Sequence, residues 1–155
     1  MEKKLKLLDV EKAEKIILRK VKPLKGKEKI DIKDSFGRVL ISNLNSKRNQ
    51  PELDLSAMDG YAVRKRDLSS LPKKFELVGE IKAGDKISKA VKKNQTFRIF
   101  TGAPIPKGAN KVVIQENCLE VGKEVLIKSE NKETYIRKKS HDISKKFTLK
   151  APRLI

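Results

Sequence analysis

The spacing of hydrophobic residues along the chain changes after about residue 22. Between residues 10 and 22, apolar side chains recur at helical spacing, after the candidate N-cap Asp9 and before Pro23, which cannot continue a helix. This pattern predicts one amphipathic helix. Farther along, apolar residues fall into short β-branched or aromatic runs bounded by Gly, Pro, Asn or Asp, which is typical of strands. Strands are predicted near residues 30–32, 39–41, 75–81, 96–100, 111–115, 125–128, 134–137 and 147–150.

The chain shows no internal repeat, no heptad pattern and no alternation of strands with helices. It is therefore predicted to be mainly β with an N-terminal α-helix. Three stretches rich in Gly, Pro and polar residues interrupt the strand pattern, at 51–62, 101–110 and 136–143. Loops carried by a rigid scaffold often hold binding residues, so these three stretches are the candidates for chemistry.

Length and composition exclude several classes of protein. The chain has 155 residues, enough for one domain or two small ones. Its single cysteine, Cys118, excludes a disulfide scaffold, and no apolar run approaches the roughly 20 residues that span a membrane. Its first residues lack the apolar segment of a secretory leader. These features predict a reduced, soluble, cytoplasmic protein that does not enter a membrane.

The net charge of +18 raises the question of nucleic-acid binding. The basic residues are 30 Lys and only eight Arg, and they are spread along the whole chain, whereas base recognition favours Arg. A lysine-rich solvated surface is therefore favoured over a nucleic-acid site. A basic nucleic-acid-binding β module remains an alternative, as does a field that attracts small anions.

Local patterns give the first two loops two interpretations each. Asp59 followed by Gly60 is most simply a turn, although Gly60 could instead let the Asp59 carboxylate enter a cleft and bind magnesium-bound water or an amine-rich ring. Thr101 followed by Gly102 could offer a hydroxyl and backbone N–H groups to an anion. The simpler interpretation is a connection made rigid by the prolines of 101–110.

The third loop holds the only histidine, His141, beside Asp142. If the two were neighbours on a strand, their side chains would point to opposite faces, and a base with its orienting acid is not expected. One His and one Cys do not make a zinc site, and no Gly-x-Ser-x-Gly motif supports a catalytic triad. The residues alone predict a β-rich module with two or three acidic or anion-contacting loops and no complete catalytic machinery.

Taken together and in order, the loops resemble the N-terminal half of the molybdopterin molybdenumtransferase family, which includes MoeA and the gephyrin E domain. Residues 51–62 match the pattern P-x-x-D-x-S-A-M-D-G-Y-A, 101–109 match T-G-A-P-x-P-x-G-A, and 112–116 match V-V-x-Q-E. Residues 136–143 follow I-R-x-x-G-x-D-I, and 37–40 follow G-R-V-L. Ser140 and His141 depart from the family's usual Gly and Glu. The match ends near Ile155, where the family enters a large α/β domain, so part of a multidomain enzyme is expected.

The resemblance implies a fold of two intertwined subdomains built from short, coiled strands. One is expected to combine residues 1–50 with 139–155, and the other to be an inserted β subdomain over 51–138. It also implies an enzyme that inserts molybdate into adenylylated molybdopterin and releases AMP with the help of Mg²⁺. This chain would supply one wall of a site at a dimer interface and would be inactive alone. A non-catalytic dimerisation or scaffold module is the second alternative.

The resemblance also implies roles for individual residues. The carboxylates would orient the pterin or magnesium-bound water, and the Thr101 hydroxyl would hold a phosphate or molybdate oxygen. The complete enzyme is expected to use Mg²⁺ and molybdate. This chain alone is expected to hold neither of them tightly, and no residues are assigned as a metal site. The expected partners are a second copy, adenylylated molybdopterin and the molybdopterin adenylyltransferase. The catalytic residues would be Asp59, Thr101 and Asp142, and the substrate contacts Ser56, Met58, Gly60, Tyr61, Gly102 and Arg137.

Overall fold

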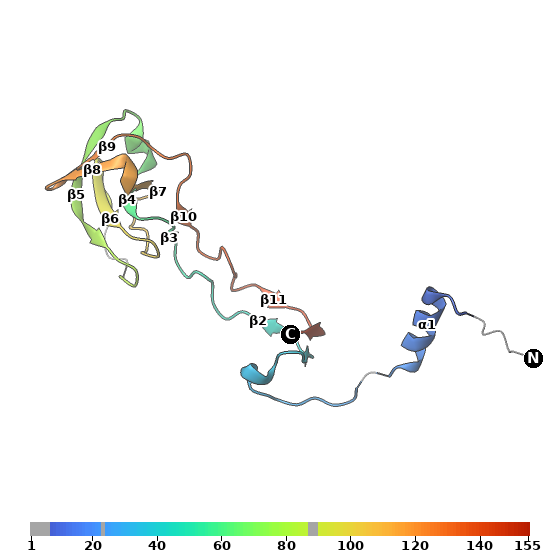
Figure 1. Cartoon of the computed structure of the whole chain (residues 1–155). Helices are drawn as coiled ribbons and strands as arrows, with labels where there is room; N and C mark the ends of the chain where they lie inside the picture. Colours follow the sequence, from blue (N-terminus) through green and yellow to red (C-terminus); the bar gives the residue numbers. More distant parts are fainter. Residues whose placement is uncertain (1–6, 23, 87–89) are drawn as a thin grey trace, which may run out of the picture. The chain divides into compact units, whose positions relative to one another are not determined.

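The computed structural model describes residues 7–22, 24–86 and 90–155 (Figure 1). These residues form two compact units. The first contains the described residues up to Ser42 together with Ala151–Ile155, and the second is Asn43–Lys150. The division expected from the resemblance, at 50/51 and 138/139, stays a prediction.

The predicted N-terminal helix is confirmed as α1, Val10–Lys20. The side chain of Asp9 caps it by accepting a hydrogen bond from the Lys12 backbone N–H at 3.3 Å. Glu11 in the first turn complements the positive end of the helix dipole. The helix ends two residues before the predicted limit, and Pro23 lies outside the described residues. No residue of α1 is buried.

The strand predicted near residues 30–32 is wrong. The 3₁₀-helix η1, Ile32–Asp34, occupies that region, because the Asp31 side chain accepts a hydrogen bond from the Lys33 N–H and caps a tight turn. The strand predicted at 39–41 is present as β1, Val39–Leu40, which pairs antiparallel with β12, Arg153–Leu154.

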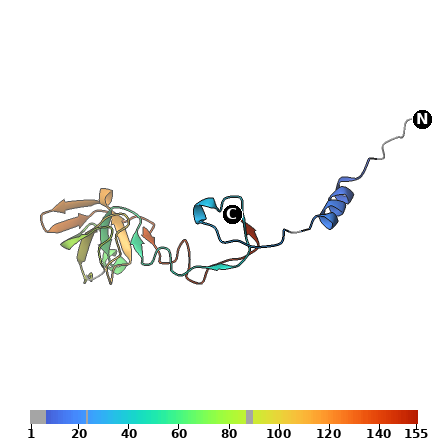
Figure 2. The ribbon, with the colours of Figure 1, turned by 90° about the horizontal axis from the view of Figure 1, so that it is seen from below.

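The second unit contains a six-stranded sheet with the order β7-β4-β6-β5-β9-β8 (Figures 1 and 2). Each neighbouring pair is antiparallel except β5 with β6. The strands are β4, Gly60–Val63; β5, Lys73–Ile81; β6, Gln95–Ile99; β7, Lys111–Ile114; β8, Cys118–Val121; and β9, Glu124–Ile127.

The sheet curls back on itself. The Tyr61 hydroxyl on β4 donates a 2.6 Å hydrogen bond to Glu120 on β8, although β6, β5 and β9 lie between these strands in the sheet. The 3₁₀-helix η3, Gln115–Asn117, joins β7 to β8. Alternate residues of β4 enter different hydrophobic clusters: Ala62 packs in one, and Tyr61 and Val63 in the other. The curled sheet therefore has an apolar core on each face.

Shorter pairs complete the second unit. Strand β2, Leu44–Asn45, pairs with β11, Thr148–Leu149, and β3, Leu55–Ser56, pairs with β10, Ile136–Arg137. The 3₁₀-helix η2, Lys65–Leu68, follows β4. The mainly β fold with an N-terminal helix is confirmed. Along the described residues, no helix combines the length and apolar character needed to cross a membrane.

Candidate functional site

Gly60 is a strand residue, so the interpretation of Asp59-Gly60 as a hairpin turn is wrong. Gly60 pairs with Ile99 on one side and Ile114 on the other, at the start of β4. A Cβ atom on Gly60 would lie 2.1 Å from the Val113 carbonyl oxygen. Glycine is needed here for the close approach of two backbones, and Asp59 lies immediately before the first residue of β4.

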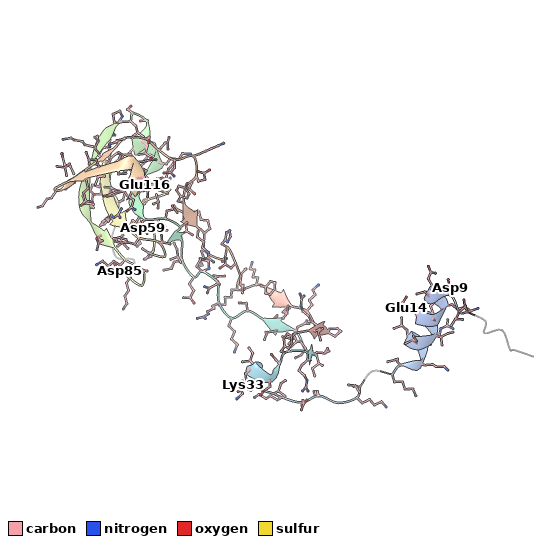
Figure 3. All side chains as sticks on the ribbon, viewed as in Figure 1. Asp9, Glu14, Lys33, Asp59, Asp85 and Glu116 are labelled. Carbon is pink, nitrogen blue, oxygen red and sulfur yellow. The ribbon has the colours of Figure 1, made fainter. Side chains whose placement is uncertain are left out.

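Asp59, which is labelled in Figure 3, contacts Thr101 directly. Its Oδ1 atom accepts hydrogen bonds from both the backbone N–H and the hydroxyl of Thr101, each at 2.8 Å. These two bonds, the backbone one first, hold the pKa of Asp59 below its usual range, and the charge of Arg98 adds to the effect. Two of the predicted catalytic residues therefore form one ionised, oriented group.

The backbone around this group is linked by further hydrogen bonds. The Gly102 N–H donates to the Ser56 carbonyl and the Ser56 N–H donates to the Ala103 carbonyl, both at 2.8 Å. The buried Ser56 hydroxyl donates to the Met58 carbonyl at 2.6 Å. Gly102 has φ of +83°, a left-handed conformation that favours glycine. Ser56 and Gly102 thus shape the loops, and their substrate contacts stay predictions.

Met58 and Tyr61 differ in exposure. The Met58 side chain is 39% exposed, whereas Tyr61 is 5% exposed and packs inside the curled sheet. Burial, together with the hydrogen bond to Glu120 and its negative charge, raises the pKa of Tyr61 to about 12. Tyr61 supports the sheet behind Asp59, and a direct substrate contact by either residue stays a prediction.

Arg98 belongs to this site and was missed by the sequence analysis. Its guanidinium carbon lies 5.1 Å from the ring centre of Tyr61 and 5.0 Å from that of Phe100. It donates to the Gln115 side-chain oxygen at 2.5 Å and to the Gly60 carbonyl at 3.4 Å. The sequence did contain a signal for the role of Arg98. It is an arginine between aromatic residues in a chain whose other basic residues are mostly lysines, and arginine stacks on aromatic rings better than lysine does.

Asp142 lies in a second polar group. It forms an ion pair with Arg137, and its Oδ1 atom lies 3.1 Å from Nδ1 of His141. The contact with His141 and then the Arg137 guanidinium hold the pKa of Asp142 below its usual range. The expectation that His141 and Asp142 point apart is wrong, because the chain has left β10 and turns here. Ser140 has φ of +66°, which suits the glycine that the family resemblance places at this position.

Asp54 is a second residue that the sequence analysis missed. It accepts hydrogen bonds from the Lys138 ammonium group at 2.7 Å and the Lys139 N–H at 2.8 Å. Although burial alone would raise the pKa of Asp54, these contacts lower it. Arg137 lies opposite Leu55 in the β3–β10 pair, so Asp54 fixes the start of the loop that carries Asp142. Among the described residues, no hydrogen bond joins the Asp59 group to the Asp142 group.

Replacing Thr101 with valine should raise the pKa of Asp59. Valine has nearly the shape of threonine but lacks the hydroxyl donor, so the ionised carboxylate loses one of its two hydrogen bonds. Thr101→Ser is the matched control, because serine keeps the donor. The pKa is measured by NMR titration of the Asp59 carboxyl carbon. Equal values in the wild type and the valine variant would contradict the assigned hydrogen bond.

Comparison with known proteins gives consistent matches. The family described as "MoeA N-terminal region (domain I and II)" matches residues 8–152. A molybdopterin molybdenumtransferase from Nostoc sp. (strain PCC 7120) is 39% identical over 104 residues, or 64% of this chain and 24% of the relative. The Bacillus subtilis (strain 168) protein of the same name is 37% identical over 93 residues, 57% of this chain and 22% of the relative.

Solved structures agree with these sequence matches. A crystal structure of the molybdopterin biosynthesis MoeA protein from Pyrococcus horikoshii OT3 aligns with a TM-score of 0.80 and 26% identity, over 95% of this chain and 40% of that chain. A second crystal structure of a Pyrococcus MoeA protein aligns at 0.68 and 30% identity, over 91% of this chain and 37% of that chain. The chain thus spans about a quarter of the length of the curated relatives.

Proposed function

The chain belongs to the family of MoeA N-terminal regions (domains I and II), and on that premise we propose that it forms one wall of a site that inserts molybdate into adenylylated molybdopterin. The observation that carries this proposal lies at the exposed start of β4, where two hydrogen bonds from Thr101 fix the carboxylate of Asp59. Relatives that contain the matching region are named molybdopterin molybdenumtransferases. A nucleic-acid-binding or scaffold module has no comparable support.

Asp59 is prepared to bind a positively charged or N–H-bearing group. Both hydrogen bonds from Thr101 reach Oδ1, and among the described residues Oδ2 accepts none. A carboxylate fixed in this way loses little conformational entropy when a ligand binds to its second oxygen. Its pKa lies below the usual range of an aspartate, so it is ionised at neutral pH and stays ionised in more acidic solution than an ordinary carboxyl group. Asp59 can therefore orient a metal-bound water or an amino group of the substrate.

We propose that the Thr101 hydroxyl positions Asp59 in place of the oxyanion contact that the resemblance implies. An ionised carboxylate only accepts hydrogen bonds, so the hydroxyl must donate its single hydrogen to Asp59. It cannot at the same time donate to a phosphate or molybdate oxygen. Thr101 accordingly positions Asp59, and the oxyanions are bound by other donors, among which the excess of basic residues favours lysine and arginine side chains.

The carboxylate of Asp59 suits a Mg²⁺ ion that is bound partly by this chain and partly by the substrate. Within the described residues, no three His, Cys, Asp or Glu side chains gather into a metal-binding group. Magnesium is commonly bound through one or two carboxylates, with water and substrate phosphates in its other positions. Asp59 would hold the ion from this chain through a metal-bound water. When bound, the ion would neutralise charge on the substrate phosphate.

The two carboxylate groups form an open surface. Thr101 and Asp142 are exposed, and Asp59 is partly exposed. Stabilising the transition state of a phosphate or molybdate transfer requires donors on more than one side of the reacting atoms, in a site that excludes water. A second wall is therefore needed. We expect another domain of a longer protein and a second copy of the chain to supply this wall. We also expect the protein to act in the cytoplasm, with the molybdopterin adenylyltransferase as the source of its substrate.

This proposal is tested with a chimera. The chain replaces the matching region of the Bacillus subtilis relative, in cells lacking that relative, and molybdenum cofactor is measured. We expect the chimera to restore the cofactor and the 155-residue chain alone to give none, because it supplies one wall only. Cofactor made by the chain alone, or a folded chimera that makes none, would contradict the proposal.

A further inference from the structure

Lys111, the first residue of β7, has a buried ammonium group. Among the described lysines it alone is buried, with 1% of its surface exposed. A buried ammonium group is costly unless it is paired and hydrogen-bonded. The Nζ atom of Lys111 meets this requirement, because it donates to the Glu130 carboxylate at 2.6 Å and also to the Asn131 backbone carbonyl. Lys111 therefore holds the chain at residues 130–131 against the sheet.

Asn131 ties the same segment to β7. Its side-chain amide donates to the Val112 carbonyl at 3.2 Å, and its Oδ1 atom accepts a hydrogen bond from the Ile114 N–H at 3.4 Å. The Val112 N–H donates to the Thr134 carbonyl at 2.9 Å. Because β7 is an end strand of the six-stranded sheet, these backbone groups face away from its strand partner β4. Residues 130–135, which we name the anchor segment, thus lie along the outer edge of β7.

The anchor segment ends in a residue with a strained backbone. Tyr135 has φ of +50°, a left-handed conformation that is unfavourable for a tyrosine. Its side chain packs against the hydrophobic cluster that contains Ala62. A conformation of this kind persists only where its surroundings hold it, and the contacts of Lys111 and Asn131 hold the segment that leads to it.

The Tyr135 carbonyl contacts the loop that carries Asp59. It accepts a hydrogen bond from the Ala57 N–H at 2.9 Å, two residues before Asp59. On its other side the loop is held by the backbone hydrogen bonds that join Ser56 to residues 102–103. The loop before Asp59 is therefore fixed between the anchor segment and the segment that follows Thr101.

We infer that Lys111 is a positioning residue for Asp59. Its ammonium group fixes the anchor segment on β7, and the segment presents the Tyr135 carbonyl to Ala57. The loop held in this way keeps the Asp59 carboxylate within reach of the two Thr101 donors. A lysine suits this role because its three N–H donors, at the end of a long apolar stem, can satisfy a carboxylate and a carbonyl together. That this positioning serves molybdate insertion rests on the proposed function.

The inference is tested with Lys111→Met in the 155-residue chain. Methionine keeps much of the apolar stem but removes the ammonium group, which loosens the anchor segment. Hydrogen exchange at the Ala57 amide should become at least about tenfold faster relative to that at Val125, which lies in β9 between β5 and β8. The pKa of Asp59, measured by NMR titration, should rise toward its ordinary range, because its hydrogen bonds from Thr101 are less populated.

Lys73→Met is the matched control. The Lys73 Nζ atom also donates to a backbone carbonyl, that of Asp67 at 3.1 Å, but Asp67 lies outside the anchor segment and the Asp59 loop. This variant should change neither the exchange ratio of Ala57 to Val125 nor the pKa of Asp59. Glu130→Gln provides the test if Lys111→Met does not fold. Glu130 is exposed, and replacing its charge weakens its bond to the lysine, so the exchange ratio should rise about threefold.

An exchange ratio and an Asp59 pKa in Lys111→Met equal to those in Lys73→Met would overturn the inference, as would an unchanged ratio in Glu130→Gln. Molybdate insertion separates the inference from the proposed function: in the chimera, Lys111→Met should lower it about tenfold at equal folded concentration. Changed exchange and pKa with unchanged insertion would contradict the proposed function and leave the inference standing. Unchanged exchange and pKa in Lys111→Met, with insertion lost in Asp59→Asn, would do the reverse.

Discussion

Replacing Gly60 with alanine is expected to destabilise the six-stranded sheet by about 3 kcal/mol or more. The added Cβ would lie 2.1 Å from the carbonyl oxygen and 2.9 Å from the carbonyl carbon of Val113, and 3.1 Å from Cα of Ile114. All three are backbone atoms of the paired strand β7, and Val113 is completely buried. Relief of the clash requires β4 and β7 to separate, which breaks their ladder and disturbs the core on both faces.

Gly122→Ala is the control for this prediction. Gly122 has φ of +60°, yet a Cβ there would meet no heavy atom within 4 Å. The variant should therefore lose only about 1 kcal/mol, the cost of a left-handed conformation. Both variants are measured by urea denaturation of the 155-residue chain, followed by circular dichroism. A Gly60→Ala variant as stable as Gly122→Ala would show that β4 and β7 are not packed as closely as described.

The parts of the fold that could be predicted from the sequence are those that depend on local patterns. The Asp9 cap and the helical spacing after it predicted α1, and short β-branched or aromatic runs bounded by turn residues predicted β5 and β6. The β4 strand was missed because all four of its residues are buried, so it shows no alternation, and its Asp-Gly start suggested a turn. At 30–32 the apolar alternation was misleading, because a capping hydrogen bond from Asp31 favours a 3₁₀ turn.

The candidate site, like the fold, could be predicted from the sequence only where local patterns sufficed. Asp59 and Thr101 could each be singled out from their own loops, but 42 positions separate them. Their contact follows from the β4–β6 register, which places Gly60 opposite Ile99. Arg98 could not be assigned from sequence, since its place depends on rings from β4 and from the end of β6. Only the resemblance to a family connected the loops before the structure did.

The second large effect is expected from Asp59→Asn in the chimera with the Bacillus subtilis relative. Asparagine has the same shape, and its oxygen can still accept both hydrogen bonds from Thr101, so the loop should keep its conformation. The variant removes only the negative charge that would bind magnesium-bound water or a substrate amino group. Removing one group of this kind commonly lowers turnover about 100-fold or more, and we expect a loss of that size.

Asp85→Asn is the matched control for the loss of one negative charge (Figure 3). Asp85 is exposed, and its carboxylate accepts a hydrogen bond from the Lys82 N–H at 2.8 Å in a turn. The change is isosteric, alters the net charge by the same amount and keeps a side-chain oxygen that can accept this hydrogen bond. Among the described residues, no hydrogen bond or ion pair joins Asp85 to Asp59 or Thr101, so molybdate insertion should stay within about twofold of the unaltered chimera.

The most direct test of the role of Asp59 is the rate at which the purified chimera converts adenylylated molybdopterin and molybdate to molybdenum cofactor. This rate is compared between Asp59→Asn and Asp85→Asn at equal folded concentration. We expect a rate about 100-fold lower for Asp59→Asn and a nearly unchanged rate for Asp85→Asn. Conversion by Asp59→Asn at the rate of the unaltered chimera would contradict the claim that this chain's strand-end carboxylate forms part of the reacting site.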